Sequence, residues 1–359
     1  MRGKRRNSPE LPDASAGTPE ERRERARQDF TFFRRAYFPH YCLVGGDSRL
    51  HEWLDTELPR MADAPEGVRL AIAAPRGEAK STFVSLFFVL WAVLTGRKHY
   101  ILIIADALEQ AASLLGAVKD ELEFNEALKR DFPGAGKGHV WNVGTVVTPG
   151  NVKIQALGAG KRMRGLRHGP HRPDLIVLDD LENDGNVDKP EQRDKLQSWL
   201  QKTVLNLGAA DGSMDVVYVG TLLHYDSVLA RTLRKPLWKA RTFRSILRWP
   251  DRMDLWDEWE SLLSSRGEAE ARRFYRQHRV KMEAGAEVSW PASRPLYRLM
   301  CLRAEDREAF DSEQQNDPLS ANEAPFNGCI TFWVDRSRDW LLFGAVDPSL
   351  GKQGAGLED

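Results

Sequence analysis

Short apolar runs alternate with longer amphipathic segments between residues 68 and 247. Six of these runs have the length and composition of buried strands. They cover residues 68–74, 100–105, 152–157, 175–179, 215–220 and 241–247. Segments of helical period lie between them at about 80–95, 107–130, 189–206 and 226–234. The alternation predicts an α/β fold with a doubly wound, mainly parallel sheet.

The rest of the chain has a different pattern. Residues 1–29 are charged and rich in Pro, Ser and Ala, which predicts a disordered tail leading into a helix near Pro19. Residues 30–248 then form the α/β domain. Residues 249–339 are rich in Trp and Arg, are broken by prolines and contain one helix around 258–281, so we interpret them as a lid or linker region. A new apolar strand at 341–347 predicts the start of another domain over residues 340–359.

Composition narrows the class of protein. With 42% hydrophobic and 29% charged residues and a formal net charge of zero, the chain is typical of a soluble globular protein. A nucleic-acid partner would therefore need local basic patches. The longest apolar stretch, at 83–94, is too short to cross a bilayer, which takes about 20 residues. Cys42, Cys301 and Cys329 have no CxxC spacing. We therefore expect a cytoplasmic protein without structural zinc.

The run "RLAIAAPRGEAKSTFVSLFF" has the order of parts that a phosphate-binding loop needs. A strand leads into a tight turn, then a lysine for the terminal phosphates and a hydroxyl residue for Mg²⁺ at the start of a helix. Lys80 is the predicted phosphate lysine, Ser81 the magnesium ligand, and Thr82 follows it. A chance loop remains the alternative on this stretch alone.

The loop departs from the usual pattern at its glycines. Ala74 and Ala79 stand where glycine is expected, and Gly77 is the only glycine within the loop. Alanine adds only a Cβ atom, so it costs little provided that both positions keep ordinary φ angles.

Acidic residues follow a wholly apolar strand in "RPDLIVLDDLEND". Carboxylates at such a strand end can hold a magnesium ion and orient the water that attacks a phosphate. Asp179 is the predicted metal-side carboxylate and Asp180 the water-activating one, with Glu182 as the alternative for the second role. A turn or helix cap is the structural alternative. In "MDVVYVGTLLHYDS", Thr221 after Gly220 is a candidate sensor of the terminal phosphate.

A basic segment, "GKRMRGLRHGPHR", precedes the acidic strand. It carries Lys161, Arg162, Arg164, Arg167 and Arg172. Such a loop could contact DNA phosphates or the nucleotide of a neighbouring subunit, and the alternative is a solvated basic loop.

Taken in order, "AAPRGEAKST", "QALGAGKRMRGLRHGPHRPDLIVLDDLEND", "VVYVGTLLHYDS", "FDSEQQNDP" and "GAVDPSLGKQG" resemble the large terminase subunit of tailed bacteriophages. That subunit is the ATP-driven motor that packages DNA. The similarity covers roughly residues 30–359. It implies a P-loop ATPase domain of the additional-strand class, with ATP and Mg²⁺ as cofactors.

The resemblance also implies roles for individual residues. Arg76, four residues before Lys80, would stabilise the developing phosphate charge or couple hydrolysis to movement. Gly220 with Thr221 would form the coupling motif. Many relatives have Asp-Glu where this chain has Asp179 and Asp180, which keeps Glu182 open as the catalytic carboxylate. Phe38, His40 and His51 would cover the adenine, with aromatic core packing as the alternative.

Family members also carry a C-terminal nuclease of RNase H-like fold. "AVDPSLGKQG" resembles its first strand, with Asp347 as the first metal ligand. The other carboxylates would lie beyond residue 359, so nuclease activity is expected to be absent from this chain. The implied partners are double-stranded DNA, a small terminase subunit and a portal protein. A homo-oligomeric ring would form only on the procapsid, in the cytoplasm of a bacterial host. A helicase-like ATPase and an inactive prophage remnant remain alternative functions.

Overall fold

The computed structural model describes residues 16–42 and 44–318. Its centre is an eight-stranded sheet in the order β3-β4-β5-β2-β6-β7-β1-β8. Six of the strands run parallel, and β3 and β4 are antiparallel to the neighbours with which they pair. The parallel strands are β1 (Arg69–Ala73), β2 (Tyr100–Ala105), β5 (Lys153–Gly158), β6 (Leu175–Asp179), β7 (Asp215–Gly220) and β8 (Lys239–Thr242). The mixed α/β class with a mostly parallel sheet is therefore confirmed.

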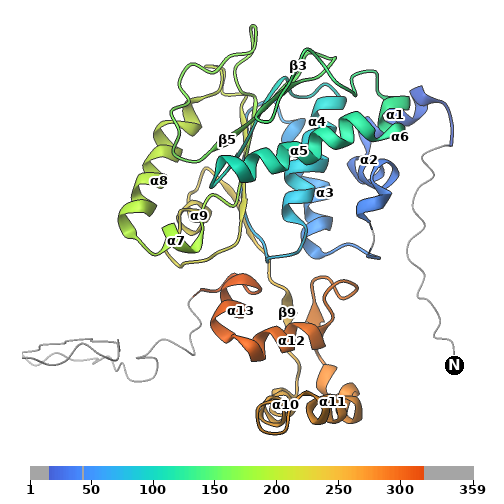
Figure 1. Cartoon of the computed structure of the whole chain (residues 1–359), viewed down its shortest axis with the longest axis vertical. Helices are drawn as coiled ribbons and strands as arrows, with labels where there is room; N and C mark the ends of the chain where they lie inside the picture. Colours follow the sequence, from blue (N-terminus) through green and yellow to red (C-terminus); the bar gives the residue numbers. More distant parts are fainter. Residues whose placement is uncertain (1–15, 43, 319–359) are drawn as a thin grey trace, which may run out of the picture. The chain divides into compact units, whose positions relative to one another are not determined.

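Alternating side chains of the strands pack into two separate cores, one on each face of the sheet. Ile101 and Ile103 of β2 lie in one core, whereas Leu102 and Ile104 lie in the other. Because every residue of β2 is buried, its sequence is continuously apolar rather than alternating. The helices therefore cover both faces, with α3, α4 and α5 on one and α8 and α9 on the other (Figure 1).

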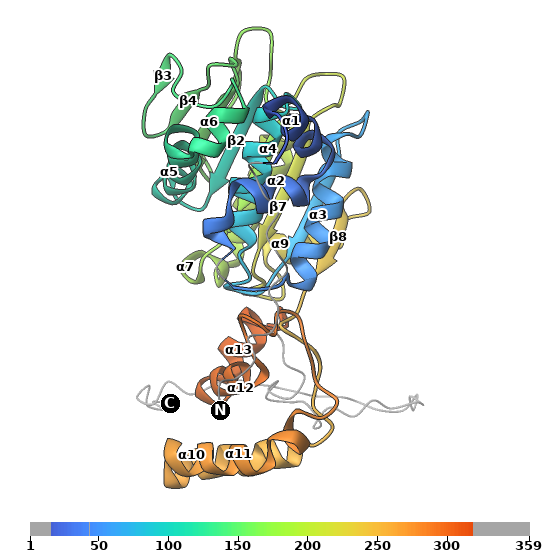
Figure 2. The same cartoon turned by 90° about the vertical axis from the view of Figure 1, so that its right-hand side faces the viewer.

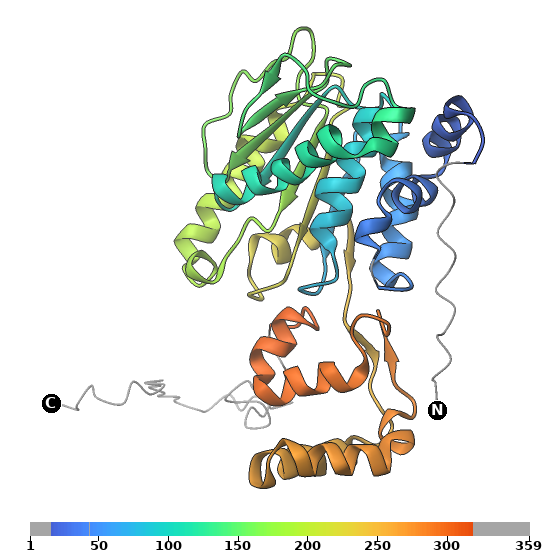
Figure 3. The same cartoon turned by 45° about the vertical axis from the view of Figure 1, so that its right-hand side comes forward.

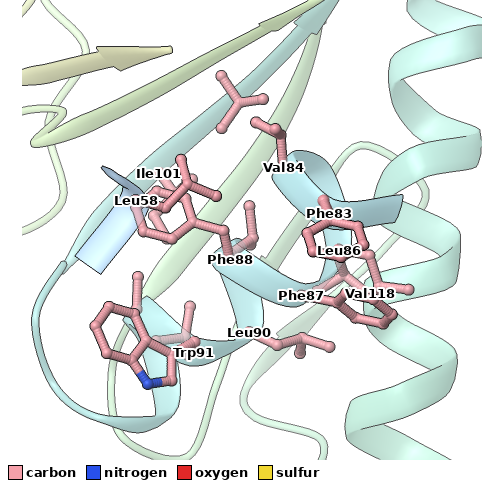
Figure 4. Packing of buried hydrophobic residues seen from close by; sticks show 14 of the residues in the cluster. Leu58, Phe83, Val84, Leu86, Phe87, Phe88, Leu90, Trp91, Ile101 and Val118 are labelled. Carbon is pink, nitrogen blue, oxygen red and sulfur yellow. The ribbon is translucent and has the colours of Figure 1, made fainter. Parts of the chain in front are cut away.

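The larger core holds the N-terminal helices and those that follow β1 and β2. These are α1 (Pro19–Gln28), α2 (Phe30–Tyr37), η1 (Pro39–Tyr41), α3 (Arg49–Ala62), η2 (Thr82–Phe88), α4 (Val89–Leu94), α5 (Leu108–Phe124) and α6 (Glu126–Asp131). Figure 3 shows α5 lying along the sheet. In Figure 4, Phe87 of η2 lies on the side of Val118 of α5, whereas Phe88 lies on the side of Ile101 of β2 and Leu58 of α3. The expected helix near Pro19 is α1, which begins at a capping box formed by Thr18 and Glu21.

The second core lies under the helices that follow β6 and β7. They are α7 (Asp184–Val187), α8 (Pro190–Lys202), η3 (Val204–Asn206) and α9 (Val228–Leu233). A short antiparallel hairpin, β3 (Val140–Trp141) and β4 (Thr145–Val147), extends the sheet beyond β5. The sequence pattern did not predict this hairpin, because two- and three-residue strands are too short to show an alternation.

Residues after β8 build a separate cluster with its own apolar core, which includes Trp256, Trp259 and Met300. Its elements are β9 (Ile246–Arg248), α10 (Met253–Arg266), α11 (Glu268–Glu283), β10 (Glu287–Val288), α12 (Leu296–Glu305) and α13 (Arg307–Glu313). We call residues 246–313 the lid segment. The single helix expected at 258–281 is wrong: Gly267, with φ 84°, ends α10 and starts α11. The two helices pack side by side, seen nearly end-on in Figure 1 and from the side in Figure 2, where they overlap.

Two further boundaries differ from the sequence prediction. The strand expected at 241–247 is divided, because the chain leaves the large sheet after Thr242 and pairs again as β9 with β10. The helix expected at 107–130 is divided at Asn125, whose side chain accepts a hydrogen bond from Leu128 N and so caps α6. Cys329, Asp347, the predicted strand at 341–347 and most of the predicted tail lie outside the described residues.

Candidate active site

Three neighbouring strands bring the predicted motifs to one edge of the sheet. β7 lies between β1 and β6 and is parallel to both, so the carboxyl ends of the three strands meet. The loop 74–81 follows β1, Asp179 and Asp180 stand at the end of β6, and Thr221 follows β7. β7 therefore separates the strand before the loop from the acidic strand.

Lys80 connects all three strand ends. Its side chain is buried, with 7% exposure, and its Nζ donates a hydrogen bond to Thr221 Oγ1 at 3.1 Å. The same Nζ lies 3.2 Å from Asp180 Oδ2. The Thr221 hydroxyl in turn donates to the carbonyl oxygen of Ala74 at 3.2 Å. The ammonium group is thus held in place by a hydroxyl and a carboxylate, and we call Lys80, Thr221 and Asp180 the lysine cluster.

The Asp179 side chain is buried, with 1% exposure. Its Oδ1 accepts a hydrogen bond from Ser81 Oγ at 2.9 Å, and its Oδ2 accepts one from Ser85 Oγ. Burial, together with the negative charge of Asp180, raises the pKa of Asp179 to about 6. A buried carboxylate next to hydroxyl groups is a donor set that suits a hard divalent cation. Ser85 was not among the predicted site residues, although it lies one helical turn after Ser81.

The backbone is strained at two points beside Lys80. Ala79 has φ 56° and Asp180 has φ 46°, both in the left-handed region that favours glycine. Ala74 does not share this conformation. The condition under which alanine costs little is therefore met at Ala74 and not at Ala79. Strain of this kind persists where surrounding contacts impose it, and it is frequent at functional sites.

Gly220 lies close to α9 and to the end of β6. A Cβ atom at this position would lie 3.1 Å from Leu229 Cδ2 and 3.4 Å from Asp180 Oδ1. The tighter of these two contacts is with the end of the Leu229 side chain, whereas the distance to Asp180 Oδ1 is an ordinary van der Waals contact.

The tip of the loop contacts the lid segment. Arg76 N donates to the carbonyl oxygen of Glu313 at 2.9 Å, and the Arg76 guanidinium pairs with the Glu313 carboxylate. Gly77 has φ 79°, and a Cβ atom there would lie 1.8 Å from Arg294 Nη2. Arg76 is thus paired with α13, whereas Lys80 and Ser81 are paired with the sheet. Thr82 is half-buried at the start of η2.

Glu78 is a fully buried acid inside the loop, and the sequence analysis did not single it out. Its Oε2 accepts a hydrogen bond from Ser289 Oγ at 3.2 Å, whereas its Oε1 has no hydrogen-bond partner among the described residues. Burial raises the pKa of Glu78, and the positive charges that His51 and Arg294 can carry oppose that shift. An acidic residue within a predicted phosphate-binding loop was the signal that could have identified it.

The carboxylate of Glu182 is bound to the start of a helix. Its Oε1 accepts from Val228 N at 2.7 Å, and its Oε2 accepts from Leu229 N at 3.1 Å and from the Tyr218 hydroxyl. Burial raises its pKa, and these hydrogen bonds counteract the shift. Glu182 therefore caps α9, in contrast to Asp180, which contacts Lys80.

Two of the three residues expected to cover an adenine are enclosed in the core. The Phe38 side chain is buried against Phe33 and Phe87. The His51 ring is buried and stacks on Phe83 with ring centroids 4.2 Å apart. His40 is half-exposed, and its Nε2 lies 2.8 Å from Glu121 Oε1. Aromatic packing, the alternative interpretation, accounts for Phe38 and His51.

The basic segment before β6 is anchored at several points. Met163 is buried in the second core, Trp199 Nε1 donates to the Lys161 carbonyl oxygen at 2.9 Å, and His168 and His171 pair through their backbones. Its five cationic side chains, from Lys161, Arg162, Arg164, Arg167 and Arg172, are exposed. None of the five forms an ion pair within the described part of the chain. They are accessible to a polyanion.

No protein-family model matches the chain, and no curated protein sequence matches it. Among solved structures, the chain is similar to the large terminase ATPase domain of Thermus phage P74-26, with 15% identity and a TM-score of 0.37 over 73% of this chain and 92% of that chain. An arginine-to-alanine variant of the same domain is similar with 14% identity and a TM-score of 0.36, over 71% of this chain and 90% of that chain. Within residues 16–42 and 44–318, no helix has the length and apolar character needed to span a membrane.

Proposed function

We propose that the chain is a magnesium-dependent ATPase whose site is the edge formed by β1, β7 and β6. The observation that carries the proposal is the position of Lys80, which contacts the end of β7 through Thr221 and the end of β6 through Asp180. A buried ammonium group between a phosphate-type loop and two strand ends is the arrangement that phosphoryl transfer requires. The sequence of the loop and the strand order both support it.

Substrate binding falls to the loop and to η2. Backbone N–H groups of the loop, from Gly77 through Ala79 to Thr82, would surround the phosphates at the start of the helix. Lys80 would exchange its contacts with Thr221 and Asp180 for the terminal phosphate oxygens. The exchange brings the phosphate next to Thr221, which is therefore placed to sense its loss.

Ser81 and Asp179 would hold Mg²⁺. The residues fit this ion because a buried carboxylate already accepts a hydrogen bond from the neighbouring hydroxyl. No cluster of three or more His, Cys, Asp or Glu side chains suited to a metal occurs among the described residues, so the remaining ligands would be water and phosphate oxygens. When bound, the ion neutralises charge on the transferred phosphoryl group.

Hydrolysis requires a carboxylate that orients water for attack on the terminal phosphorus. We assign this role to Asp180, because the alternative, Glu182, is committed to the N-terminus of α9. The new bond forms between the water oxygen and phosphorus while the bond to the bridging oxygen of ADP breaks. Asp180 accepts the water proton. Arg76 would leave Glu313 and stabilise the charge on the phosphoryl group.

The cellular role that we propose is that of a terminase-type motor moving double-stranded DNA. Two features support it: the ordered motifs that resemble terminase large subunits, and the exposed basic segment at 161–172. The partners would then be DNA, a small terminase subunit and a portal protein. Copies of the chain would assemble into a ring on the procapsid, in the cytoplasm of a bacterial host.

Phosphate release from ATP, measured with and without Mg²⁺, tests the proposed chemistry. We expect Lys80→Ala to lower kcat by about 100-fold or more, the loss typical for a preorganised electrostatic contact. Lys129→Ala is the matched control, because Lys129 lies at the surface in an ion pair with Glu126. Equal turnover in the Lys80→Ala variant and the unmodified chain would refute the site. No turnover by either would favour an inactive remnant.

The type of DNA distinguishes a packaging motor from a helicase. We expect double-stranded DNA to stimulate hydrolysis more than single-stranded DNA, and the protein not to separate the strands of a short duplex. ATP-dependent strand separation would instead favour a helicase-like enzyme.

A further inference from the structure

The end of α13 and the residues that follow it contact both the loop and the chain that follows β7. Glu313 accepts a hydrogen bond from Arg76 N, and the Gln314 carbonyl oxygen accepts one from Ser245 N at 2.8 Å. Asn316 then reaches the residue that follows Thr221. Residues 313–316 come more than 200 positions after the loop in the sequence. Asn316 has no role in the mechanism proposed above.

Asn316 makes two hydrogen bonds with backbone groups of different segments. Its Oδ1 accepts from Leu222 N at 2.9 Å, and its Nδ2 donates to the Phe243 carbonyl oxygen at 2.8 Å. The residue is buried, with 5% exposure, and has φ 51°. Asparagine is the side chain that combines one acceptor, one donor group and tolerance of the left-handed region. The left-handed backbone, the Oδ1 acceptor and the Nδ2 donor of Asn316 therefore each have a role at this position.

Both backbone groups belong to the surroundings of the lysine cluster. The Leu222 N–H is part of the peptide group that begins at the Thr221 carbonyl carbon, so the hydrogen bond fixes the backbone of Thr221. The Phe243 N–H donates to the Ala73 carbonyl oxygen at the end of β1, at 2.8 Å. Asn316 thus ties the chain after β7 to the chain after β8, which is itself bonded to the loop strand.

We infer that Asn316 is a positioning residue, which holds the Thr221 hydroxyl where it contacts Lys80 Nζ and the Ala74 carbonyl oxygen. This inference rests on the proposed function. Asn316 acts through Thr221, because none of its hydrogen bonds among the described residues goes to the loop or to Lys80. It therefore governs how the site responds to the terminal phosphate more than how tightly the site binds nucleotide.

Loss of the amide group leaves a buried N–H without its acceptor, because Leu222 is itself buried. The Thr221 backbone is then free to shift. We expect kcat for DNA-independent ATP hydrolysis to fall about tenfold in Asn316→Gly, which corresponds to about 1.4 kcal/mol. We expect KM to change by less than about threefold, because Lys80 and Ser81 stay in place.

Asn316→Gly and Asn151→Gly form a matched pair. Both asparagines have a left-handed backbone, with φ 51° and 59°, and glycine accepts that conformation at either position. Asn151 lies in the turn between β4 and β5. Asn151→Gly should hydrolyse ATP like the unmodified chain. If Asn316→Gly also keeps its kcat, the inference is wrong.

The variant Asn316→Asp distinguishes an effect on the position of Thr221, read from kcat, from an effect on folding stability, read from the melting temperature. It keeps an oxygen for the Leu222 N–H but places a second oxygen opposite the Phe243 carbonyl oxygen. We expect a lower melting temperature with a kcat within about twofold of the unmodified chain. This variant keeps the side-chain volume, so it serves even where Asn316→Gly does not fold. A tenfold lower kcat in Asn316→Asp would overturn the inference.

A double-mutant cycle with Thr221→Val tests the route of the effect. If Asn316 acts through Thr221, Asn316→Gly should have no further effect on kcat once the Thr221 hydroxyl has been removed. The double variant should then be no slower than Thr221→Val alone. Rate losses that multiply would show that Asn316 acts elsewhere. The failure of the proposed function looks different: the unmodified chain would have no turnover that depends on Lys80, and this inference would fall with it.

Discussion

Ala79 lies in a left-handed backbone conformation, so its replacement by glycine should stabilise the protein. The strain of a non-glycine residue with φ near 56° is about 1–2 kcal/mol. Glycine also makes the unfolded chain more flexible, which costs about 0.4–1 kcal/mol. The difference predicts that Ala79→Gly stabilises the folded state by about 0.8 kcal/mol.

Ala74→Gly is the internal comparison, because Ala74 occupies the other glycine position of the pattern but has no left-handed φ. Its side chain is fully buried, so the change removes one buried methyl group, worth about 0.8 kcal/mol, and adds the same unfolded-state cost. We expect Ala74→Gly to destabilise the protein by about 1.5 kcal/mol. The two substitutions are chemically identical, yet they should change the stability of the folded state in opposite directions.

The assay is thermal and urea unfolding followed by tryptophan fluorescence, without nucleotide. For a chain of this size, the predicted difference between the two variants corresponds to a separation of about 5 °C in melting temperature. The reasoning is refuted if Ala79→Gly lowers the melting temperature as much as Ala74→Gly does. That result would mean that the loop does not hold Ala79 in a strained conformation in solution.

Other substitutions test further contacts. Glu78→Gln should raise the melting temperature at pH 8 and have little effect at pH 4. Burial raises the pKa of Glu78, so ionisation of this carboxyl costs the folded state stability once the pH exceeds the ordinary glutamate pKa of about 4.3. Glutamine has no charge to bury, so it removes that cost at pH 8. An equal effect at both pH values would contradict this assignment. Glu182→Gln should destabilise the protein by about 1–3 kcal/mol in urea unfolding, because one acceptor of the α9 cap is replaced by a donor. An unchanged urea midpoint would remove Glu182 from that role. Charge reversal of Arg162 and Arg164 should weaken DNA stimulation of ATP hydrolysis, most strongly at low salt, while leaving DNA-free turnover unchanged. Unaltered stimulation would exclude the basic segment from DNA binding.

The strands of the large sheet could be predicted because their signal is local. β2, β6 and β7 are buried along their whole length, so their residues are apolar except for Asp179 at the end of β6 and Asp215 at the start of β7. The same holds for the helix after the loop, whose aromatic residues pack in the larger core. The predicted element boundaries were wrong where a single residue sets the local backbone conformation, as Gly267 does between α10 and α11.

The order and type of the polar residues at the strand ends were also evident in the sequence. Lys80, Ser81, Asp179 and Thr221 each follow or end a predicted strand. Parallel strands place such residues at one edge of a sheet, so the pattern of strands and polar residues is sufficient to predict their convergence. Their separate roles could not be assigned, because Asp180 and Glu182 differ only in what they contact.

The sequence by itself predicted most of the parallel strands of the large sheet, and it singled out candidate residues for phosphate and magnesium chemistry. The tertiary structure alone decided that β7 lies between β1 and β6, that Glu182 caps α9 while Asp180 contacts Lys80, and that Asn316 holds the backbone beside Thr221. The physical reason is range. Hydrophobic periodicity acts between near neighbours, whereas the contact of Asn316 with Leu222 joins residues 94 positions apart and leaves no periodic pattern in the sequence.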